Sequence, residues 1–208
     1  MPGFLFNGPK DAPITLVLAH GAGAPMDSPF MDAIAAGVAE AGIRVARFEF
    51  PYMHRRRETD SRGAPDPGPV LARSWRDAID KLGGSERLVI GGKSLGGRIA
   101  SMIADEAAVR GLVCLGYPFH PPGKVEQVRV RHLEHLRTAA LIVQGTRDAL
   151  GKPDEVSKYK LSSAICIEWL EDGDHSFKPR ARSGRSAADN LKEAVRLVTE
   201  FVKSLSTK

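Results

Sequence analysis

The hydrophobic residues of the chain gather in six short, nearly continuous runs, each ending in glycine or in polar turn residues. Continuous apolar runs of this length are typical of strands that are covered on both faces, as in a parallel sheet packed between helices. The six predicted strands are residues 14–19, 44–50, 87–91, 111–115, 140–144 and 164–170.

Between the strands, apolar residues recur at the spacing of amphipathic helices. The pair Ser28-Pro29 is typical of a helix start, and Gly42 of its end. Further helices are predicted over residues 69–82, from Ser94 or Leu95 onward, over about 130–136, and from about Ser186 toward the end. Strands that alternate with helices predict an α/β fold with a mostly parallel sheet of six or seven strands, flanked by helices.

The length of 208 residues suits one domain over residues 1–208, without repeats or linkers. The long stretch of residues 51–68 is predicted to be irregular, and loops of that length are usually functional or mobile. The apolar runs are too short to span a membrane, and the first residues lack the features of a signal peptide. We therefore expect a cytoplasmic protein.

Charge and cysteine content change this picture little. The net charge of +5 is too small to favour a nucleic-acid partner. Cys114 and Cys166 both fall in predicted strands, so we expect two buried thiols and no disulfide.

His132 and His135 have the spacing of a metal-ligand pair, but no third ligand accompanies them. We expect neither a metal nor an organic cofactor.

The stretch "GGKSLGG", residues 91–97, fits two different kinds of site. Its Gly-Lys-Ser resembles the end of a phosphate-binding loop, in which Lys93 would contact the nucleotide. That loop needs a glycine five residues before Gly92, where this chain has Arg87. The predicted strand also runs directly into Gly92 and leaves no room for a wrapping loop, so this interpretation is disfavoured.

The same residues also fit G-x-S-x-G, the sharp strand-turn-helix that exposes a serine nucleophile. A predicted strand precedes Ser94 and a predicted helix follows it, as this turn requires. The strained turn brings neighbouring segments close together, so the positions two before and two after the serine must be small. Those positions are Gly92 and Gly96.

A serine nucleophile needs a base, and the base needs a carboxylate to orient it. In this type of fold the order is serine, acid, histidine, each after a strand. Asp148 follows the fifth predicted strand and His175 the sixth, so we predict a Ser94–His175–Asp148 triad. Asp172 and Asp174 lie near the histidine in sequence but are typical turn residues around a glycine.

A tetrahedral intermediate needs backbone N–H groups directed at its oxyanion. The N–H of Leu95, at the start of the helix, is one candidate. The second should come from the loop "HGAGAP", residues 20–25, where Ala22 is the first choice and Gly23 the next. His20 is interpreted as a brace for this loop, and Lys93 as a solvated or stem-packed side chain without a chemical role.

Four stretches resemble, in order, the core landmarks of the α/β-hydrolase superfamily: "LVLAHGAGAP", "GGKSLGG", "VQGTRD" and "DGDHSF". The resemblance implies a compact α/β-hydrolase fold that lacks the first one or two strands of the full fold and has no large lid domain. It also implies a serine hydrolase architecture with no established substrate.

A narrower resemblance rests on "RFEFPYM", "GGKSLGGR", "GLVCLGYPFHPPGK" and "DHSFKPRARSG". These stretches are similar to a small branch near the dienelactone-hydrolase-like proteins, which groups bacterial predicted hydrolases with the mammalian Tex and KANL proteins. Some of these relatives are thought to be components of complexes rather than enzymes. Dienelactone hydrolases proper use cysteine where this chain has Ser94, so their substrate does not carry over.

Residues near the predicted functional edge of the sheet are candidates for binding substrate. Tyr117 and His120 follow the fourth predicted strand, and they either line the pocket or form a rigid turn. Arg56 belongs to a set of basic residues that follow two strands and would form a positive rim favouring an anionic substrate. The alternative is ordinary solvated loop charge. The set comprises Arg55, Arg56, Arg57, Arg62, Lys178, Arg180, Arg182 and Arg185.

The sequence thus predicts a serine hydrolase that cleaves a carboxylic ester or thioester through an acyl-enzyme. The first alternative is a catalytically silent interaction or scaffold protein with the same fold. Nucleic-acid binding through the arginines is a further alternative, which predicts strongly salt-dependent retention on DNA or RNA. Substrate identity, and whether the chain forms a homodimer, are left open.

Overall fold

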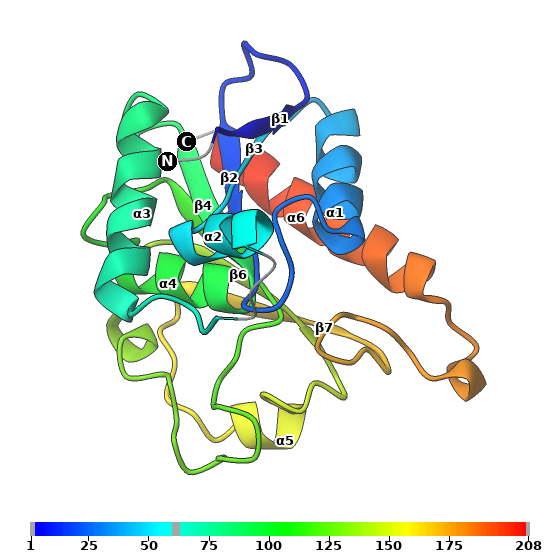
Figure 1. Cartoon of the computed structure of the whole chain (residues 1–208). Helices are drawn as coiled ribbons and strands as arrows, with labels where there is room; N and C mark the ends of the chain where they lie inside the picture. Colours follow the sequence, from blue (N-terminus) through cyan, green and yellow to red (C-terminus); the bar gives the residue numbers. More distant parts are fainter. Residues whose placement is uncertain (1–2, 60–62, 207–208) are drawn as a thin grey trace.

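Seven strands form one sheet in the order β1-β3-β2-β4-β5-β6-β7 (Figure 1). The computed structural model describes residues 3–59 and 63–206. β1 pairs antiparallel with β3, and every other neighbouring pair is parallel. The strands are β1 (Leu5–Asn7), β2 (Thr15–Ala19), β3 (Arg44–Phe48), β4 (Leu88–Lys93), β5 (Gly111–Leu115), β6 (Ala140–Gly145) and β7 (Ile165–Leu170).

The six strands predicted from apolar runs all occur, and the predicted α/β class with its mostly parallel sheet is confirmed. The seventh strand, β1, was missed because three residues with largely exposed side chains make no recognisable apolar run. Its pairing with β3, Leu5 opposite Arg47, adds an antiparallel edge to the sheet.

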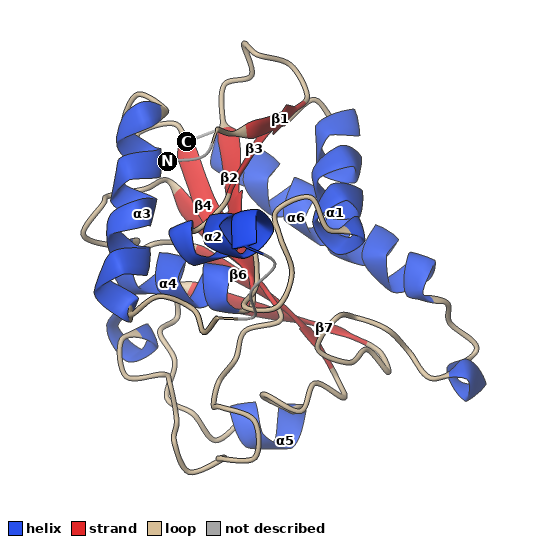
Figure 2. Ribbon diagram, in the orientation of Figure 1, coloured by secondary structure: helices blue, strands red, loops and turns tan. Residues whose placement is uncertain are grey.

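Helices cover both faces of the sheet and bury two separate cores (Figure 2). On one face α3 (Gly68–Lys81) and α4 (Leu95–Ile103) bury side chains such as Trp75 and Ile99. On the other face α1 (Pro29–Glu40) and α6 (Ala187–Ser206) bury Ile34 and Val198. Each large apolar side chain removed from water stabilises the fold by about 1.5–3 kcal/mol before entropy is counted.

Part of the stretch predicted to be irregular is helical. α2 spans Pro51–Thr59, and residues 60–62 of the stretch lie outside the described residues. Its centre is a run of polar side chains with no apolar stripe, so hydrophobic periodicity could not reveal it. Its first turn buries Tyr52 and Met53 in the core, and the guanidinium of Arg57 donates to the buried carboxylate of Glu49 at 2.9 and 3.0 Å.

Two other short helices differ from the sequence prediction. The helix predicted over residues 130–136 is a single 3₁₀ turn, Leu133–His135, and a four-residue helix, α5 (Pro153–Val156), follows β6. The described residues between strands hold no inserted domain, as the resemblance to lidless hydrolases implied. Within the same residues, no helix is long and apolar enough to cross a membrane.

The two cysteines have different environments. Cys114 lies on the central strand β5 and is buried, as expected. The expectation for Cys166 was wrong, since this thiol is exposed. The reason is its place on β7, the edge strand, whose side chains are only partly covered. An apolar run predicts a strand but does not reveal which strand lies at the edge.

At the centre of the sheet, β2 lies so close to the junction of β4 and α4 that only glycine fits there. A Cβ atom added at Gly92 would lie 2.0 Å from the carbonyl oxygen of Ala19. One added at Gly96 would lie 2.3 Å from the same oxygen. Both distances are far below van der Waals contact with backbone, so the two glycines predicted to be small are required by packing.

We expect Gly96→Ala to lower the free energy of unfolding by about 1–3 kcal/mol, because the new methyl group collides with backbone that cannot yield. Gly68→Ala is the matched control, since a Cβ atom there meets nothing within 4 Å. In the control the same added methyl group should be neutral or slightly stabilising. Urea denaturation measures both, and equal midpoints would contradict the packing argument.

Candidate active site

Ser94 connects β4 to α4 in a strained backbone conformation. Its φ of 49° and ψ of −109° lie where residues with a side chain are rarely found. Such strain costs about 1–3 kcal/mol and persists only when surrounding contacts impose it. Here the N–H of Ser94 donates to the carbonyl of Leu115 at 3.0 Å, and Arg98 closes the first helical turn onto the Ser94 carbonyl. The turn lifts the serine side chain above the carboxyl edge of the sheet.

Three side chains from three loops meet at this edge. Nε2 of His175, after β7, lies 2.9 Å from Oγ of Ser94. Nδ1 of the same ring lies 2.7 Å from Oδ2 of Asp148, after β6. Because an ionised carboxylate can only accept, Nδ1 carries the proton and donates it, and Nε2 accepts from the serine hydroxyl. The structure therefore brings together the three residues that the sequence singled out.

The carboxylate of Asp148 is fully buried and accepts hydrogen bonds at both oxygens. Oδ1 accepts from the N–H of Leu150 at 2.9 Å. Oδ2 accepts from Nε2 of Gln144 at 2.9 Å and from His175. These donors satisfy the charge in the absence of water and fix the direction in which the carboxylate faces the imidazole.

Gln144 was overlooked in the sequence. It occupies β6, is fully buried, and joins two loops as well as orienting Asp148. Its Oε1 accepts from the N–H of Tyr117 at 2.7 Å, and its Nε2 also donates to the carbonyl of Gly151 at 3.3 Å. The available signal was a polar residue inside an otherwise apolar buried strand, which needs partners to justify its burial.

The loop that carries His175 is held from several sides. Asp172 pairs with Arg180 and Arg147, and the bond from Arg180 lowers the pKa of Asp172 to about 2. Oδ1 of Asp174 accepts from the backbone N–H of Ser176 at 2.8 Å. Both acids thus shape the turn, as expected from their positions around a glycine, and the contact with the imidazole belongs to Asp148.

His20 braces the loop after β2. Its Nε2 accepts from the N–H of Phe50 at 3.0 Å, so Nδ1 carries the proton and donates to the carbonyl of Gly21 at 2.7 Å. Tyr52 donates to the same carbonyl, and Arg56 donates to the carbonyl of Ala22 at 2.9 Å.

These bonds fix the direction of the N–H groups in that loop. In a trans peptide the N–H points opposite to the carbonyl of the preceding residue. With the carbonyls of Gly21 and Ala22 turned toward His20, Tyr52 and Arg56, the N–H groups of Ala22 and Gly23 face the other way. The structure thus leaves both of the candidate oxyanion donors in this loop available.

A cavity of about 340 Å³ opens beside Ser94 and His175. Its walls are mostly small or apolar: residues 21–24 of the braced loop, Ser28, Phe30, Met31, Lys93, Ser94, His175 and Ser176.

The three candidate substrate-binding residues lie elsewhere than these walls. Tyr117 and His120 are buried, with the Tyr117 hydroxyl donating to the carbonyl of Arg129 and the His120 ring bonded to that of Pro121. Their stretch therefore forms a packed turn. Arg56 contacts the loop of the cavity from behind, through the carbonyl of Ala22.

The predicted positive rim is partly neutralised within the protein. Arg55 pairs with Asp66, and Arg57 pairs with Glu49 and Asp27. Arg180 pairs with Asp172, as described above. Arg62, from the same predicted set, lies outside the described residues. Arg56 and Arg185 instead donate to uncharged acceptors, the carbonyl of Ala22 and Oδ1 of Asn190. The rim therefore keeps part of its positive charge.

We expect acid pH to destabilise the fold through His20. Burial lowers the pKa of His20 below its ordinary value of 6.5, so the unfolded chain binds this proton more readily than the folded one. The contribution of His20 to stability is therefore complete above the ordinary pKa of 6.5 and is lost as the pH falls below 6.5 toward the lowered pKa of the folded state. Denaturant unfolding should therefore show a smaller free energy at about pH 5 than at about pH 7.

His20→Gln should reduce this dependence, because an amide can accept from Phe50 without titrating. The exposed His135→Gln is the control and should keep the wild-type slope. Equal slopes in the wild type and in His20→Gln would contradict the assignment.

Comparison with known proteins places this chain in a family. The model of the alpha/beta hydrolase domain matches residues 12–203. An alpha-beta serine hydrolase homologue from Coxiella burnetii is 19% identical over 97% of this chain and 94% of its own, with a TM-score of 0.71. Est1E from Butyrivibrio proteoclasticus, solved with ferulic acid, is 14% identical over 99% and 96%, with a TM-score of 0.71. Dienelactone hydrolase from Anabaena variabilis is 21% identical over 97% and 90%, with a TM-score of 0.70. The structural likenesses agree with the family match in fold: the chain belongs to the alpha/beta hydrolase domain family, and the protein is an α/β-hydrolase.

Proposed function

We propose that this hydrolase cleaves a carboxylic ester or thioester through an acyl-enzyme on Ser94. The observation that carries the proposal is the line of hydrogen bonds from Ser94 through His175 to the buried Asp148, beside an open cavity. A neutral serine hydroxyl is a weak nucleophile, and this line supplies the base and the orienting acid that activate it.

In the proposed reaction, Oγ of Ser94 attacks the substrate carbonyl while Nε2 of His175 takes the hydroxyl proton. The tetrahedral intermediate collapses as the imidazolium protonates the leaving alcohol or thiol, which leaves the acyl group on Ser94. Water then attacks this ester, with His175 again removing a proton and returning it to Ser94. Asp148 keeps its charge throughout and stabilises the imidazolium.

The oxyanion of each intermediate would be held by two backbone N–H groups. Leu95 is the first residue of α4, and the first amides of a helix have no acceptor within the helix. The N–H of Ala22 is our first choice for the second donor, and that of Gly23 is the next. The hydrogen bonds that hold the carbonyls of Gly21 and Ala22 leave both N–H groups pointing in the opposite direction. A preorganised pair of this kind commonly contributes the largest part of the rate.

The cavity suggests the size of the acyl group. A volume of about 340 Å³ with walls that include Phe30 and Met31 suits a short aliphatic or single-ring acyl chain. The similar structure of Est1E was solved with ferulic acid, so esters of aromatic acids are sensible first substrates to assay. The leaving group would extend toward solvent, since the described residues place no lid over the site.

We expect Ser94→Ala to abolish labelling by a fluorophosphonate probe and to lower kcat for ester hydrolysis by about 10³-fold or more, with an unchanged melting temperature. Ser157→Ala, an exposed serine, serves as the control and should label as the wild type does. Continued labelling of Ser94→Ala would place the nucleophile elsewhere. A folded wild-type protein that neither labels nor turns over esters would favour the alternative of a silent interaction protein.

Asp148→Asn tests the orienting acid separately. The amide has the same shape, but its NH₂ group faces a donor where the carboxylate accepted, so the imidazole is held in the wrong tautomer. We expect kcat to fall by about 10³–10⁴-fold while KM changes little. Steady-state kinetics on one ester measure both constants, and a variant with wild-type kcat would rule out this role for Asp148.

A further inference from the structure

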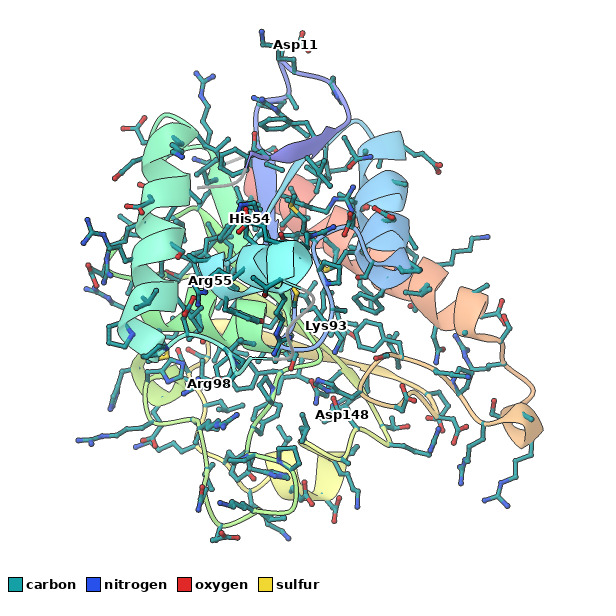
Figure 3. All side chains as sticks on the ribbon, in the orientation of Figure 1. Asp11, His54, Arg55, Lys93, Arg98 and Asp148 are labelled. Atoms are coloured by element: carbon teal, nitrogen blue, oxygen red, sulfur yellow. The ribbon has the colours of Figure 1, made fainter. Side chains whose placement is uncertain are left out.

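Lys93 is the last residue of β4 and shares a peptide bond with Ser94. Of the two interpretations offered for its side chain, solvated or packed along its stem, burial excludes the first, because only 9% of the residue is exposed. Its ammonium group donates to the backbone carbonyl of His175 at 2.5 Å. Lys93 thus joins the residue beside the nucleophile to the residue that carries the base, across a sequence separation of 82 positions. Figure 3 labels Lys93 and Asp148 on the same edge of the sheet.

The space for this side chain depends on glycines. A Cβ atom at Gly116 would lie 2.8 Å from Nζ of Lys93 and 2.9 Å from the carbonyl oxygen of His175. A Cβ atom at Gly21 would lie 3.4 Å from the Lys93 stem. On its remaining side, Nζ lies 5.6 Å from the centre of the Phe30 ring, in the wall of the cavity.

Burial of this ammonium group is costly. Desolvation lowers the pKa of Lys93 to about 8, although the charges of Asp148 and Asp174 act against the shift. An apolar side chain could fill the same space without that cost. The hydrogen bond from the ammonium group of Lys93 to the backbone carbonyl of His175 therefore explains why a charged side chain occupies this space.

We propose that Lys93 is a positioning residue of the reaction, which holds His175 at its working distance from Ser94 by binding the histidine carbonyl. The inference rests on the proposed function of Ser94. The loop of His175 is flanked by two residues with unfavourable positive φ, Asp172 at 53° and Phe177 at 68°. Such a loop would relax if a contact were lost, and a displacement of about 1 Å at a reacting group can lower the rate about 100-fold.

The contact predicts a particular pH dependence. The ionisable groups that face Nζ are Asp148, Asp174 and His175 itself. An ammonium group is a stronger donor than the neutral amine, so the tether weakens as Lys93 loses its proton above about pH 8. In the wild type, kcat should fall on the alkaline side with a midpoint near this pH.

The test compares the wild type with Lys93→Met, Lys93→Arg and the exposed control Lys160→Met, in kcat, KM and melting temperature across pH. In Lys93→Met we expect kcat to fall about 10- to 100-fold, KM to change little, and the alkaline limb near pH 8 to disappear. The melting temperature should hold or rise, because a buried charge has been removed. Lys93→Arg should recover part of kcat and move the limb to higher pH, and Lys160→Met should match the wild type.

A Lys93→Met protein with kcat within about twofold of wild type and the same alkaline limb would overturn the inference. A fall in kcat that only follows a fall in melting temperature would also overturn it, since it would show a structural role. If Lys93→Met does not fold, Lys93→Gln takes its place, because its amide keeps a polar donor in the site but does not titrate. The alkaline limb of kcat should then disappear, and an unchanged limb would overturn the inference.

Activity that depends on Ser94 is established first in the wild type. An inactive wild type therefore counts against the proposed function and the inference together, whereas an active wild type with an unaffected Lys93 variant counts against the inference alone.

Discussion

The close approach of the Ala19 carbonyl to Gly92 and Gly96 is the constraint on which the site depends. It presses β2 against the junction of β4 and α4 and leaves Ser94 in a backbone conformation that the serine would not adopt alone. Two further glycines extend this packing on the other side, where a Cβ atom at Gly91 would lie 1.9 Å from the carbonyl oxygen of Val113 and one at Gly97 would lie 2.6 Å from that of Gly92. The strained position of Ser94, the proposed nucleophile, follows from this packing at the centre of the sheet.

A second layer of polar contacts directs the groups around Ser94. His20 and Arg56 fix the carbonyls of the loop after β2, and Gln144 fixes the carboxylate of Asp148. Lys93 fixes the backbone of His175. Each of these side chains donates its hydrogen bond to another group of the protein. Apart from Lys93 and His175, the side chains that line the cavity are small or apolar, so most of the polar contacts that direct the site come from outside the cavity.

Much of the fold and three central residues of the site could be predicted from local sequence. Ser94, Asp148 and His175 each follow a recognisable strand, and a parallel sheet brings such positions to one edge. Gln144 was overlooked although a polar residue in a buried strand is a signal, and the partner of Lys93 is a backbone carbonyl 82 positions away, which no spacing reveals.

The remaining errors also come from features that the local pattern of apolar residues does not reveal. α2 was missed because its buried apolar residues, Tyr52 and Met53, are adjacent and make no helical period, and the exposure of Cys166 follows from strand order. Tyr117 and His120 lie at this edge of the sheet but are buried: Tyr117 packs in the core, and the His120 ring bonds to Pro121 and Glu155. The turn after β5 passes through Gly116 with a φ of 67° before reaching them.

The central claim is that Ser94 carries the acyl group during turnover. The most direct measurement is rapid-mixing hydrolysis of a p-nitrophenyl ester, followed by acid quenching and peptide mapping by mass spectrometry. We expect a burst of about one nitrophenol per chain, as an acyl-enzyme mechanism gives when deacylation is slow, with the acyl group on the peptide that contains Ser94. An acyl group on another residue, or turnover with no acylated protein at any time, would contradict it.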